Sequence, residues 1–227
     1  MRTQLIIDNL IKFLKEKYGK GIKIKPSTNH EVFKIVISTI LSQRTRDENT
    51  EKAAKNLFSR ANTPEKILKL RKNELEKLIK VSGPFRQKAK RIKAVSKIIL
   101  EKYKGKVPKS REELMKLPGV GFKTADVVLM YGHGIPSIAI DTHANRIPKR
   151  IGLVDKEANL EEVKRTLESL IPKKDWYIVN LGLVQFGREI CRPINPRCNV
   201  CPMSKYCDYY KKIFKQGDDA AYKKLHI

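Results

Sequence analysis

Apolar residues recur at helical spacing along most of the chain, and regular strand alternation is scarce. In "MRTQLIIDNLIKFLKEKYG" (1–19) they fall on one helical face. "EVFKIVISTIL" (31–41) is apolar nearly all round, which is typical of a central, buried helix. "FRQKAKRIKAVSKIILEKY" (85–103) is amphipathic, with cations along it at Arg86, Lys88, Lys90, Arg91, Lys93 and Lys97. The pattern predicts an all-α fold of about ten helices.

Local signals mark where these helices begin. Capping boxes, in which a polar N-cap precedes glutamate by three positions, are predicted at Thr28, Asn73, Ser110 and Asn159. Thr63 followed by Pro64 predicts an N-cap with proline at the first helical position. Short loops are expected at 20–28, 60–63, 81–84, 104–110 and 132–141. The Gly- and Pro-rich "YGHGIPS" (131–137) is the best candidate for a domain crossing.

The chain is strongly basic. Its 227 residues include 49 Lys and Arg against 24 Asp and Glu, a net charge of +25. This excess favours a polyanionic partner, nucleic acid before an anionic membrane, over a merely lysine-rich solvated surface. No apolar run approaches the roughly 20 residues that cross a bilayer. The N-terminal segment carries Asp8 and Glu16 and is no signal peptide, so we expect a cytoplasmic protein.

"LPGVGFKTADVVL" (117–129) predicts a helix–hairpin–helix. Ser110 caps a short helix, Pro118 ends it, and a turn over Gly119, Val120 and Gly121 leads into a second helix. Glycines permit positive φ and leave no Cβ between the backbone and a ligand. The N–H groups at the second helix start can then hold a phosphate of DNA without reading sequence. An ordinary αα-turn is the alternative, and the net charge favours DNA binding.

Lys123 lies in the first turn of that second helix, where the helix dipole disfavours a cation. It could bind phosphate. It could also be a nucleophile, because an amine attacks only when neutral and both the helix start and desolvation favour the neutral form. The residues alone leave the two roles equally supported.

Asp141, in "SIAIDTHANRI", follows 18 residues after Lys123 and precedes another predicted helix. It could simply be the N-cap of that helix, or it could also supply a carboxylate near the lysine. The two roles can coexist, because a cap fixes the side chain at the helix end.

Four cysteines lie within 17 positions, in the order C-x6-C-x2-C-x5-C, at Cys191, Cys198, Cys201 and Cys207. Such clustering indicates a metal site more than a set of disulfides. Structural zinc sites more often use two close pairs separated by a longer insert. A single compact loop suits a bulky iron–sulfur cluster better, although zinc stays open on spacing alone.

The hairpin "LPGVGFKTADVVL", then "AIDTHANRI", then the cysteine spacing resemble the endonuclease III family of helix–hairpin–helix DNA glycosylase/lyases. The resemblance runs from Asn29 to Cys207 and includes "ILSQRTRDENTEKAAKNLF" and "GPFRQKAKRIKAVSKIILEKYKGKVPKSREEL". It implies two all-α domains. A six-helix barrel would span 26–134, and a discontinuous domain would combine 1–25 with 135–227, including the cluster loop 191–207.

The resemblance also implies chemistry. Lys123 would be the Schiff-base nucleophile, Asp141 its catalytic partner, and the four cysteines the ligands of a 4Fe–4S cluster. The substrate would be double-stranded DNA with an oxidised pyrimidine of the thymine-glycol type or an abasic site, handled by a monomer in the cytoplasm, associated with the nucleoid. Lysine favours a glycosylase that is also an AP lyase, since adenine-mismatch relatives carry serine there and thymine-mismatch relatives commonly carry tyrosine. The expected DNA contacts are Gln43, Arg44, Pro84, Phe85, Arg86, Gly119, Val120, Gly121, Thr142 and His143.

Some positions depart from the family pattern. Arg44 stands where glutamine often fills the gap left by a flipped base, and Gln43 precedes it, so either could fill the gap. Pro84 replaces a larger apolar wedge, whose place Phe85 or Arg86 could take. The 20 residues after Cys207 form an extra helix or a basic tail. The competing functions are a non-catalytic DNA-binding module, an iron–sulfur redox protein, or a glycosylase for mismatched or alkylated bases.

Overall fold

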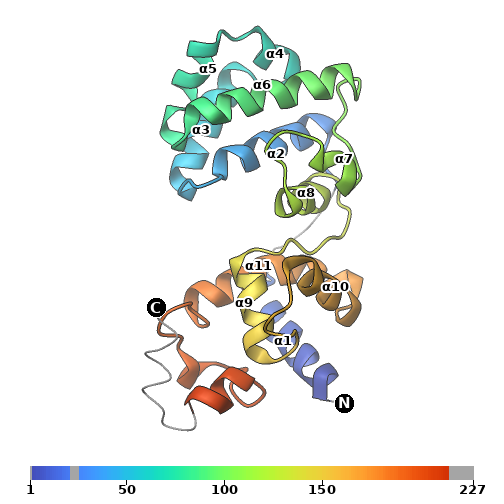
Figure 1. Ribbon diagram of the computed structural model, residues 1–227, viewed down its shortest axis with the longest axis vertical. Helices are drawn as coiled ribbons and strands as arrows, with labels where there is room; N and C mark the ends of the chain where they lie inside the picture. Colours follow the sequence, from blue (N-terminus) through green and yellow to red (C-terminus); the bar gives the residue numbers. More distant parts are fainter. Residues whose placement is uncertain (1, 21–25, 215–227) are drawn as a thin grey trace. The chain divides into compact units, whose positions relative to one another are not determined.

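The computed structural model describes residues 2–20 and 26–214, and within these ranges the chain is helical without a strand (Figure 1). The predicted all-α class is therefore confirmed. The chain divides into two compact units: one combines Met1–Lys23 with Pro136–Ile227, and the other is the continuous segment Ile24–Ile135. The boundary between Ile135 and Pro136 lies inside the segment 131–137, where a crossing was expected.

The continuous unit is built around α2 (Asn29–Ser42). This helix buries Phe33, Ile37 and Ile40 and contacts both α3 (Asp47–Arg60) and α6 (Phe85–Glu101). Its nearly uniform apolar sequence is explained by this central position, because a helix surrounded by others must bury most of its faces. The remaining elements of this unit are α4 (Pro64–Lys69), α5 (Lys72–Leu78), the 3₁₀ turn η1 (Lys80–Ser82), α7 (Arg111–Met115), α8 (Phe122–Val127) and the π-helical turn η2 (Val128–Gly132).

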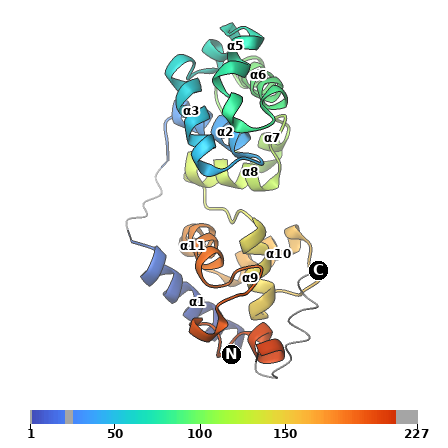
Figure 2. The ribbon, with the colours of Figure 1, turned by 90° about the vertical axis from the view of Figure 1, so that its left-hand side faces the viewer.

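The discontinuous unit packs the N-terminal helix against a helix near the other end of the chain. α1 (Arg2–Tyr18) lies beside α11 (Trp176–Glu189), with Phe13 and Phe186 in edge contact (Figure 2). The other elements of this unit are α9 (Thr142–Ile151), α10 (Leu160–Leu170), η3 (Lys173–Asp175), η4 (Cys198–Val200) and η5 (Tyr210–Phe214). After Cys207 the described chain ends in the helical turn η5, and 215–227, on which the choice between an extra helix and a basic tail depends, lie outside the described residues.

Most of the predicted caps are present. Thr28 and Asn159 form complete capping boxes, and the hydroxyls of Thr63 and Ser110 accept from the backbone N–H groups of Lys66 and Glu113. The box predicted at Asn73 is wrong. α5 begins earlier, with Arg71 as its N-cap, and the Asn73 side chain accepts from the N–H of Glu74 at 2.9 Å inside the first turn.

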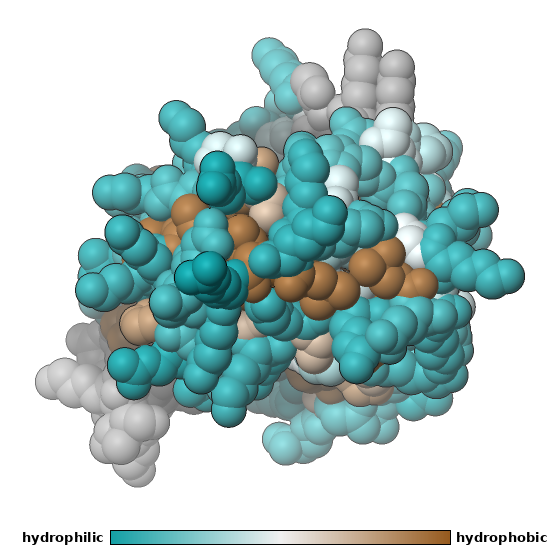
Figure 3. Space-filling model, turned by 90° about the horizontal axis from the view of Figure 1, so that it is seen from above, coloured by the Kyte–Doolittle hydropathy of each residue, from teal (hydrophilic) through white to brown (hydrophobic). Residues whose placement is uncertain are grey.

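The exterior agrees with the basic composition. Figure 3 shows a face covered mostly by hydrophilic side chains, with a narrow band of hydrophobic ones among them. Among the described residues, no helix combines the length and apolar character that crossing a bilayer requires.

Candidate functional site

The hairpin between α7 and α8 has the backbone that its sequence predicts. Gly119 adopts φ +86°, in the left-handed region that favours glycine. A Cβ built there would lie 2.8 Å from Cδ of Arg91, a residue of α6. The carbonyl of Gly119 accepts from Nε2 of Gln43 at 2.7 Å, and Oε1 of Gln43 accepts from Arg91 at 2.9 Å. Gln43 and Arg91 therefore hold the hairpin against α2 and α6.

The start of α8 is open. Its N-cap is Gly121, which supplies no capping side chain, and a Cβ built there would have no neighbour within 4 Å. The neighbouring Phe122 side chain is exposed. The first N–H groups of the helix consequently face space in which a ligand could approach the backbone. Val120 differs from its neighbours, because its side chain is buried and its N–H donates to the Leu117 carbonyl, which leaves little of it for a DNA contact.

A buried ion pair fixes α8 against α7. Both Nε and Nη2 of Arg111 donate to Oδ1 of Asp126, at 3.0 and 2.6 Å, and the Asp126 side chain is only 2% exposed. The guanidinium of Arg111 also lies 5.8 Å from the ring centre of Phe122. The ion pair thus fixes the direction in which α8 leaves the turn. It also fixes the backbone position from which Lys123 projects.

Lys123 lies in the first turn of α8, as predicted, and its side chain is exposed. The desolvation considered from the sequence is therefore not provided by the free protein. The exposed amine has room to reach a ligand held at the hairpin, and shielding from water would have to come with that ligand.

Asp141 is the N-cap of α9. Its Oδ1 accepts from the N–H groups of His143 and Ala144 at 2.9 and 2.8 Å, which leaves Oδ2 for another partner. The capping role is confirmed, and the carboxylate is held in one orientation by it. Beside it Thr142 is exposed, and Nδ1 of His143 lies 3.1 Å from Nη2 of Arg146.

Two loops of the continuous unit carry the other expected contacts. After α2, Arg44 is exposed and adopts φ +52°, while the Gln43 amide is occupied by Gly119 and Arg91. Before α6, Pro84 is exposed, and Phe85 packs partly buried against the apolar core. Arg86 is exposed, with its guanidinium 5.7 Å from the Phe85 ring centre.

Sequence reasoning missed Lys88, which was counted only among the cations of an amphipathic helix. It is 1% exposed, and its Nζ donates to the carbonyls of Leu41 and Ser82 at 2.6 and 2.5 Å and to Oγ1 of Thr45 at 2.6 Å. The signal was available in the spacing, because Lys88 occupies the same stripe as Ile92, Val95 and Ile99, all of which are buried.

All four cysteines line one small pocket in the discontinuous unit, together with apolar side chains such as Phe186 and Met203. Burial raises the pKa of the Cys198 thiol to about 11 and that of Cys201 to about 12. The pKa of the Cys207 thiol is also raised by burial. Thiols of this kind become thiolates only when a cation or cluster compensates the charge.

Four soft sulfur donors line this one pocket. Such a donor set suits an iron–sulfur cluster or a zinc ion. Nη1 of Arg150 lies 3.7 Å from Sγ of Cys191, so a cation already faces the sulfurs.

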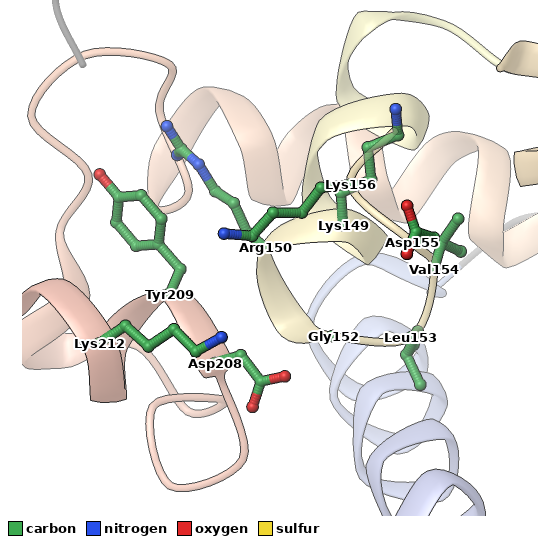
Figure 4. Close-up of a pocket in the computed structure, with 10 residues that line it drawn as sticks. All are labelled: Lys149, Arg150, Gly152, Leu153, Val154, Asp155, Lys156, Asp208, Tyr209 and Lys212. Carbon is green, nitrogen blue, oxygen red and sulfur yellow. The ribbon is translucent and has the colours of Figure 1, made fainter. Parts of the chain in front are cut away.

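A larger cleft, of about 750 Å³, also has Arg150 in its lining. Figure 4 shows Lys149, Lys156 and Lys212 around it, with Tyr209 beside Arg150, whose guanidinium is 4.5 Å from the ring centre. Arg150 also donates to the carbonyls of Arg192 and Pro193 at 2.6 and 2.9 Å. This residue therefore ties the cysteine loop to α9.

Comparisons with known proteins agree with these features. Residues 37–173 match the family described as "HhH-GPD superfamily base excision DNA repair protein". Endonuclease III of Thermotoga maritima is 50% identical over 200 residues, covering 87% of this chain and 93% of that protein.

Solved structures give the same answer. A trapped endonuclease III–DNA covalent intermediate is 34% identical, with a TM-score of 0.82 over 93% of this chain and 98% of that chain. A thermostable thymine-DNA glycosylase is 28% identical, with a TM-score of 0.80 over 93% and 97%. The family expected from the sequence is thus confirmed. The chain belongs to the HhH-GPD superfamily of base excision DNA repair proteins and, within it, to the endonuclease III family.

Proposed function

We propose that this protein removes oxidised pyrimidines from double-stranded DNA and then cleaves the strand at the abasic site. The glycosylase and AP lyase activities in base excision repair follow from membership in the endonuclease III family. The preference for bases of the thymine-glycol type is our proposal. The observation that supports the lyase chemistry is Lys123, an exposed amine in the first turn of the second hairpin helix in a chain of this family. The lesion preference rests on the resemblance to the family and is tested by the panel of duplexes below.

DNA binding begins at the hairpin. Gly121 leaves the N–H groups of the α8 start uncovered, and Gly119 sets the turn that presents them. Backbone donors bind phosphate without reading sequence, as an enzyme that scans for damage needs. The net charge of +25 adds affinity that salt would weaken. The proposal keeps the predicted division into two domains, 26–134 and 1–25 with 135–227.

The reaction starts with the damaged base outside the stack, because its glycosidic bond cannot be reached inside the duplex. Neutral Lys123 attacks C1′ of the sugar, the glycosidic bond breaks, and its electron pair leaves with the base, which is protonated. Asp141 stabilises the positive charge that develops on the sugar and accepts the proton that the lysine loses. Its Oδ1 is occupied by the α9 N–H groups, so we assign this role to Oδ2.

Strand cleavage follows from the bond that Lys123 has formed. The C1′–O4′ bond then breaks, its electron pair leaves on O4′, and O4′ takes up the proton that Asp141 had accepted. The iminium that this ring opening forms between Nζ and C1′ acidifies the hydrogen at C2′. Removal of that proton forms a double bond between C2′ and C3′, and the C3′–O bond breaks with its electron pair leaving on the phosphate. Water then hydrolyses the iminium and restores the lysine. No external oxidant or reductant is required at any step.

Filling the gap left by the flipped base is assigned to Arg44. Its side chain is exposed on the loop after α2, whereas the Gln43 amide already bonds Gly119 and Arg91. Of the residues before α6, Pro84 and Arg86 are exposed and Phe85 packs against the core, so the wedge is assigned to Pro84 and Arg86.

The four cysteines would hold a 4Fe–4S cluster. When bound, the cluster supplies structural support to the loop 191–207 and takes no part in the lysine chemistry. Arg150 would face the Cys191 ligand and keep the loop attached to α9. Localisation in the cytoplasm and a monomeric state remain predictions.

The test is borohydride trapping on a panel of duplexes that contain thymine glycol, uracil, a G·T mismatch, an alkylated purine or an abasic site. We expect covalent trapping with thymine glycol and with the abasic site, and its loss in Lys123→Gln. Lys72→Gln is the matched control, because Lys72 is also an exposed lysine in the first turn of a helix of the same unit. Trapping by Lys123→Gln at the wild-type level would refute the nucleophile assignment.

One alternative function has a specific observation behind it, the likeness to a thymine-DNA glycosylase. The panel separates the two, because a mismatch enzyme would release thymine from the G·T duplex in preference to thymine glycol. Binding without cleavage of any duplex would instead indicate a non-catalytic DNA-binding module.

A further inference from the structure

The ammonium of Lys88 is buried where two loops meet. Its Nζ bonds the Leu41 carbonyl and Thr45 Oγ1, from the end of α2 and the loop after it, and the Ser82 carbonyl, from the turn before α6. An ammonium has three donors and no acceptor, and here each donor has one acceptor. The Thr45 hydroxyl adds a direct bond between the loops, donating to the Ser82 carbonyl at 2.6 Å.

A lysine at this position needs an explanation. Burying a cation is costly unless it is fully hydrogen-bonded, and a methionine would continue the apolar stripe of Ile92 and Val95 without that cost. Burial, with the nearby charge of Arg91, lowers the pKa of Lys88 to about 8, so the ammonium still prevails at neutral pH. The charge is retained even though the site disfavours it.

The two loops that Lys88 joins carry the residues assigned to DNA penetration. Arg44 precedes Thr45 directly, and Pro84 follows Ser82 by two positions. The loops also touch at Gly83, where a built Cβ would lie 3.6 Å from the Arg44 carbonyl oxygen and from Thr45 Oγ1. Both backbones are in the left-handed region, Arg44 at φ +52° and Gly83 at φ +80°, so neither loop is in a conformation that ordinary residues adopt easily.

We propose that Lys88 is a positioning residue that binds the loop after α2 to the turn before α6, so that Arg44 and Pro84 enter the duplex as one rigid element. Lys88 itself lies in the interior and does not contact DNA. Without it the bond from Thr45 to Ser82 is the hydrogen bond described above that still joins the two loops, so they are held less rigidly, and the flipped base and its estranged partner are no longer held apart at a fixed distance. The proposal rests on the proposed function, because it concerns the step that opens the duplex.

The experiment uses the full-length protein and a duplex with 2-aminopurine opposite an abasic site. The fluorescence of 2-aminopurine rises when this base is unstacked, so it reports the action of the loops before any bond breaks. Lys88→Met keeps the unbranched apolar stem of the side chain and removes the donor. Thr45→Val keeps the shape and removes both the Lys88 acceptor and the bond to Ser82. Lys93→Met is the matched control, because Lys93 on the same helix also donates to backbone carbonyls, those of Leu68 and Leu70, away from the two loops.

We expect Lys88→Met to lose most of the fluorescence rise and roughly 100-fold in cleavage rate on the duplex, as a displaced catalytic geometry does. On a single-stranded abasic oligonucleotide, which has no partner base to displace, it should be trapped by borohydride at near the wild-type yield. Thr45→Val should show the same pattern in weaker form, and Lys93→Met should behave as wild type on both substrates.

The outcomes separate this inference from the proposed function. A wild-type protein that neither unstacks 2-aminopurine nor is trapped contradicts the function. A wild-type response from Lys88→Met and Thr45→Val on the duplex overturns the positioning role alone. An equal loss on single and double strands also overturns it, because that loss indicates a general folding defect. If Lys88→Met does not fold, Thr45→Val decides by itself, since it leaves Lys88 two carbonyl acceptors.

Discussion

The two hairpin glycines should fail in different ways when a methyl group is added. Gly119 holds φ +86°, and a built Cβ lies 2.8 Å from Arg91 Cδ. The left-handed backbone costs an ordinary residue roughly 1–2 kcal/mol. Displacing Arg91 weakens its bond to Gln43 as well, worth about 1 kcal/mol. Gly119→Ala should therefore lower the free energy of unfolding by roughly 2–3 kcal/mol.

Gly121→Ala should behave in the opposite way. Gly121 has φ −101° and ψ −175°, which alanine adopts freely, and no atom lies within 4 Å of the built Cβ. The variant should be as stable as wild type, or up to about 1 kcal/mol more stable, because alanine restricts the unfolded chain. Its methyl group stands where a phosphate must approach the backbone, so affinity for abasic DNA should fall about tenfold, equivalent to about 1.4 kcal/mol.

Urea unfolding and fluorescence anisotropy with a labelled abasic duplex measure the two quantities separately. Gly105→Ala is a useful control, since Gly105 also has positive φ, +77°, but lies in the loop after α6, away from the hairpin. Gly105→Ala should lower the free energy of unfolding. Its apparent affinity for DNA should fall only by the fraction of the protein that is unfolded. If Gly121→Ala folds as wild type and binds DNA with unchanged Kd, the assignment of this hairpin face to the DNA backbone is incorrect.

Three further predictions concern separate parts of the molecule. Asp141→Asn should keep the α9 cap, because asparagine caps as well as aspartate. Its free energy of unfolding in urea should lie within about 0.5 kcal/mol of wild type, while cleavage of abasic duplexes is lost. Asp141→Ala should lose both the activity and about 1 kcal/mol of stability. Because the pKa of Lys88 is lowered from 10.5 to about 8, the unfolded chain binds more protons in that window. The free energy of unfolding should therefore rise with pH from 8 to 10.5, and urea titrations at several pH values should show this rise reduced in Lys88→Met. Cys201→Ala, prepared without oxygen, should lose the visible absorbance of an iron–sulfur cluster and its iron by metal analysis; wild-type iron content in this variant would argue against Cys201 as a ligand.

What the sequence predicted well depends on neighbouring residues. The caps at Thr28, Thr63 and Asn159 could be found because a cap and its N–H partner lie within three positions. The prediction at Asn73 failed for a local reason too. An asparagine can accept from the next N–H inside a first turn as well as cap it, and the spacing to Glu76 does not distinguish the two.

In the candidate site too, features set by neighbouring residues were predicted and features set by distant segments were not. The Gly119 turn and the compact cysteine loop are properties of short segments, and both are present. Gln43 bonds the hairpin 76 residues further along the chain, and Lys88 bonds the end of α2, 47 residues before it. A pattern of cations along a helix predicts solvent contact, and only the packing of α2 against α6 shows that one of those cations is enclosed.

The packing of α1 against α11 has a consequence for folding during synthesis on the ribosome. The chain's first helix emerges with Ile6, Leu10 and Leu14 ready to be buried, yet its partner helix begins only at Trp176. The continuous unit Ile24–Ile135 is completely synthesised before α11. It can therefore fold while α1 has no partner helix. During that interval the apolar face of α1 is not covered by α11, so the nascent chain is a candidate for chaperone binding. A truncated product that ends before α11 keeps this face uncovered and is a candidate for rapid degradation.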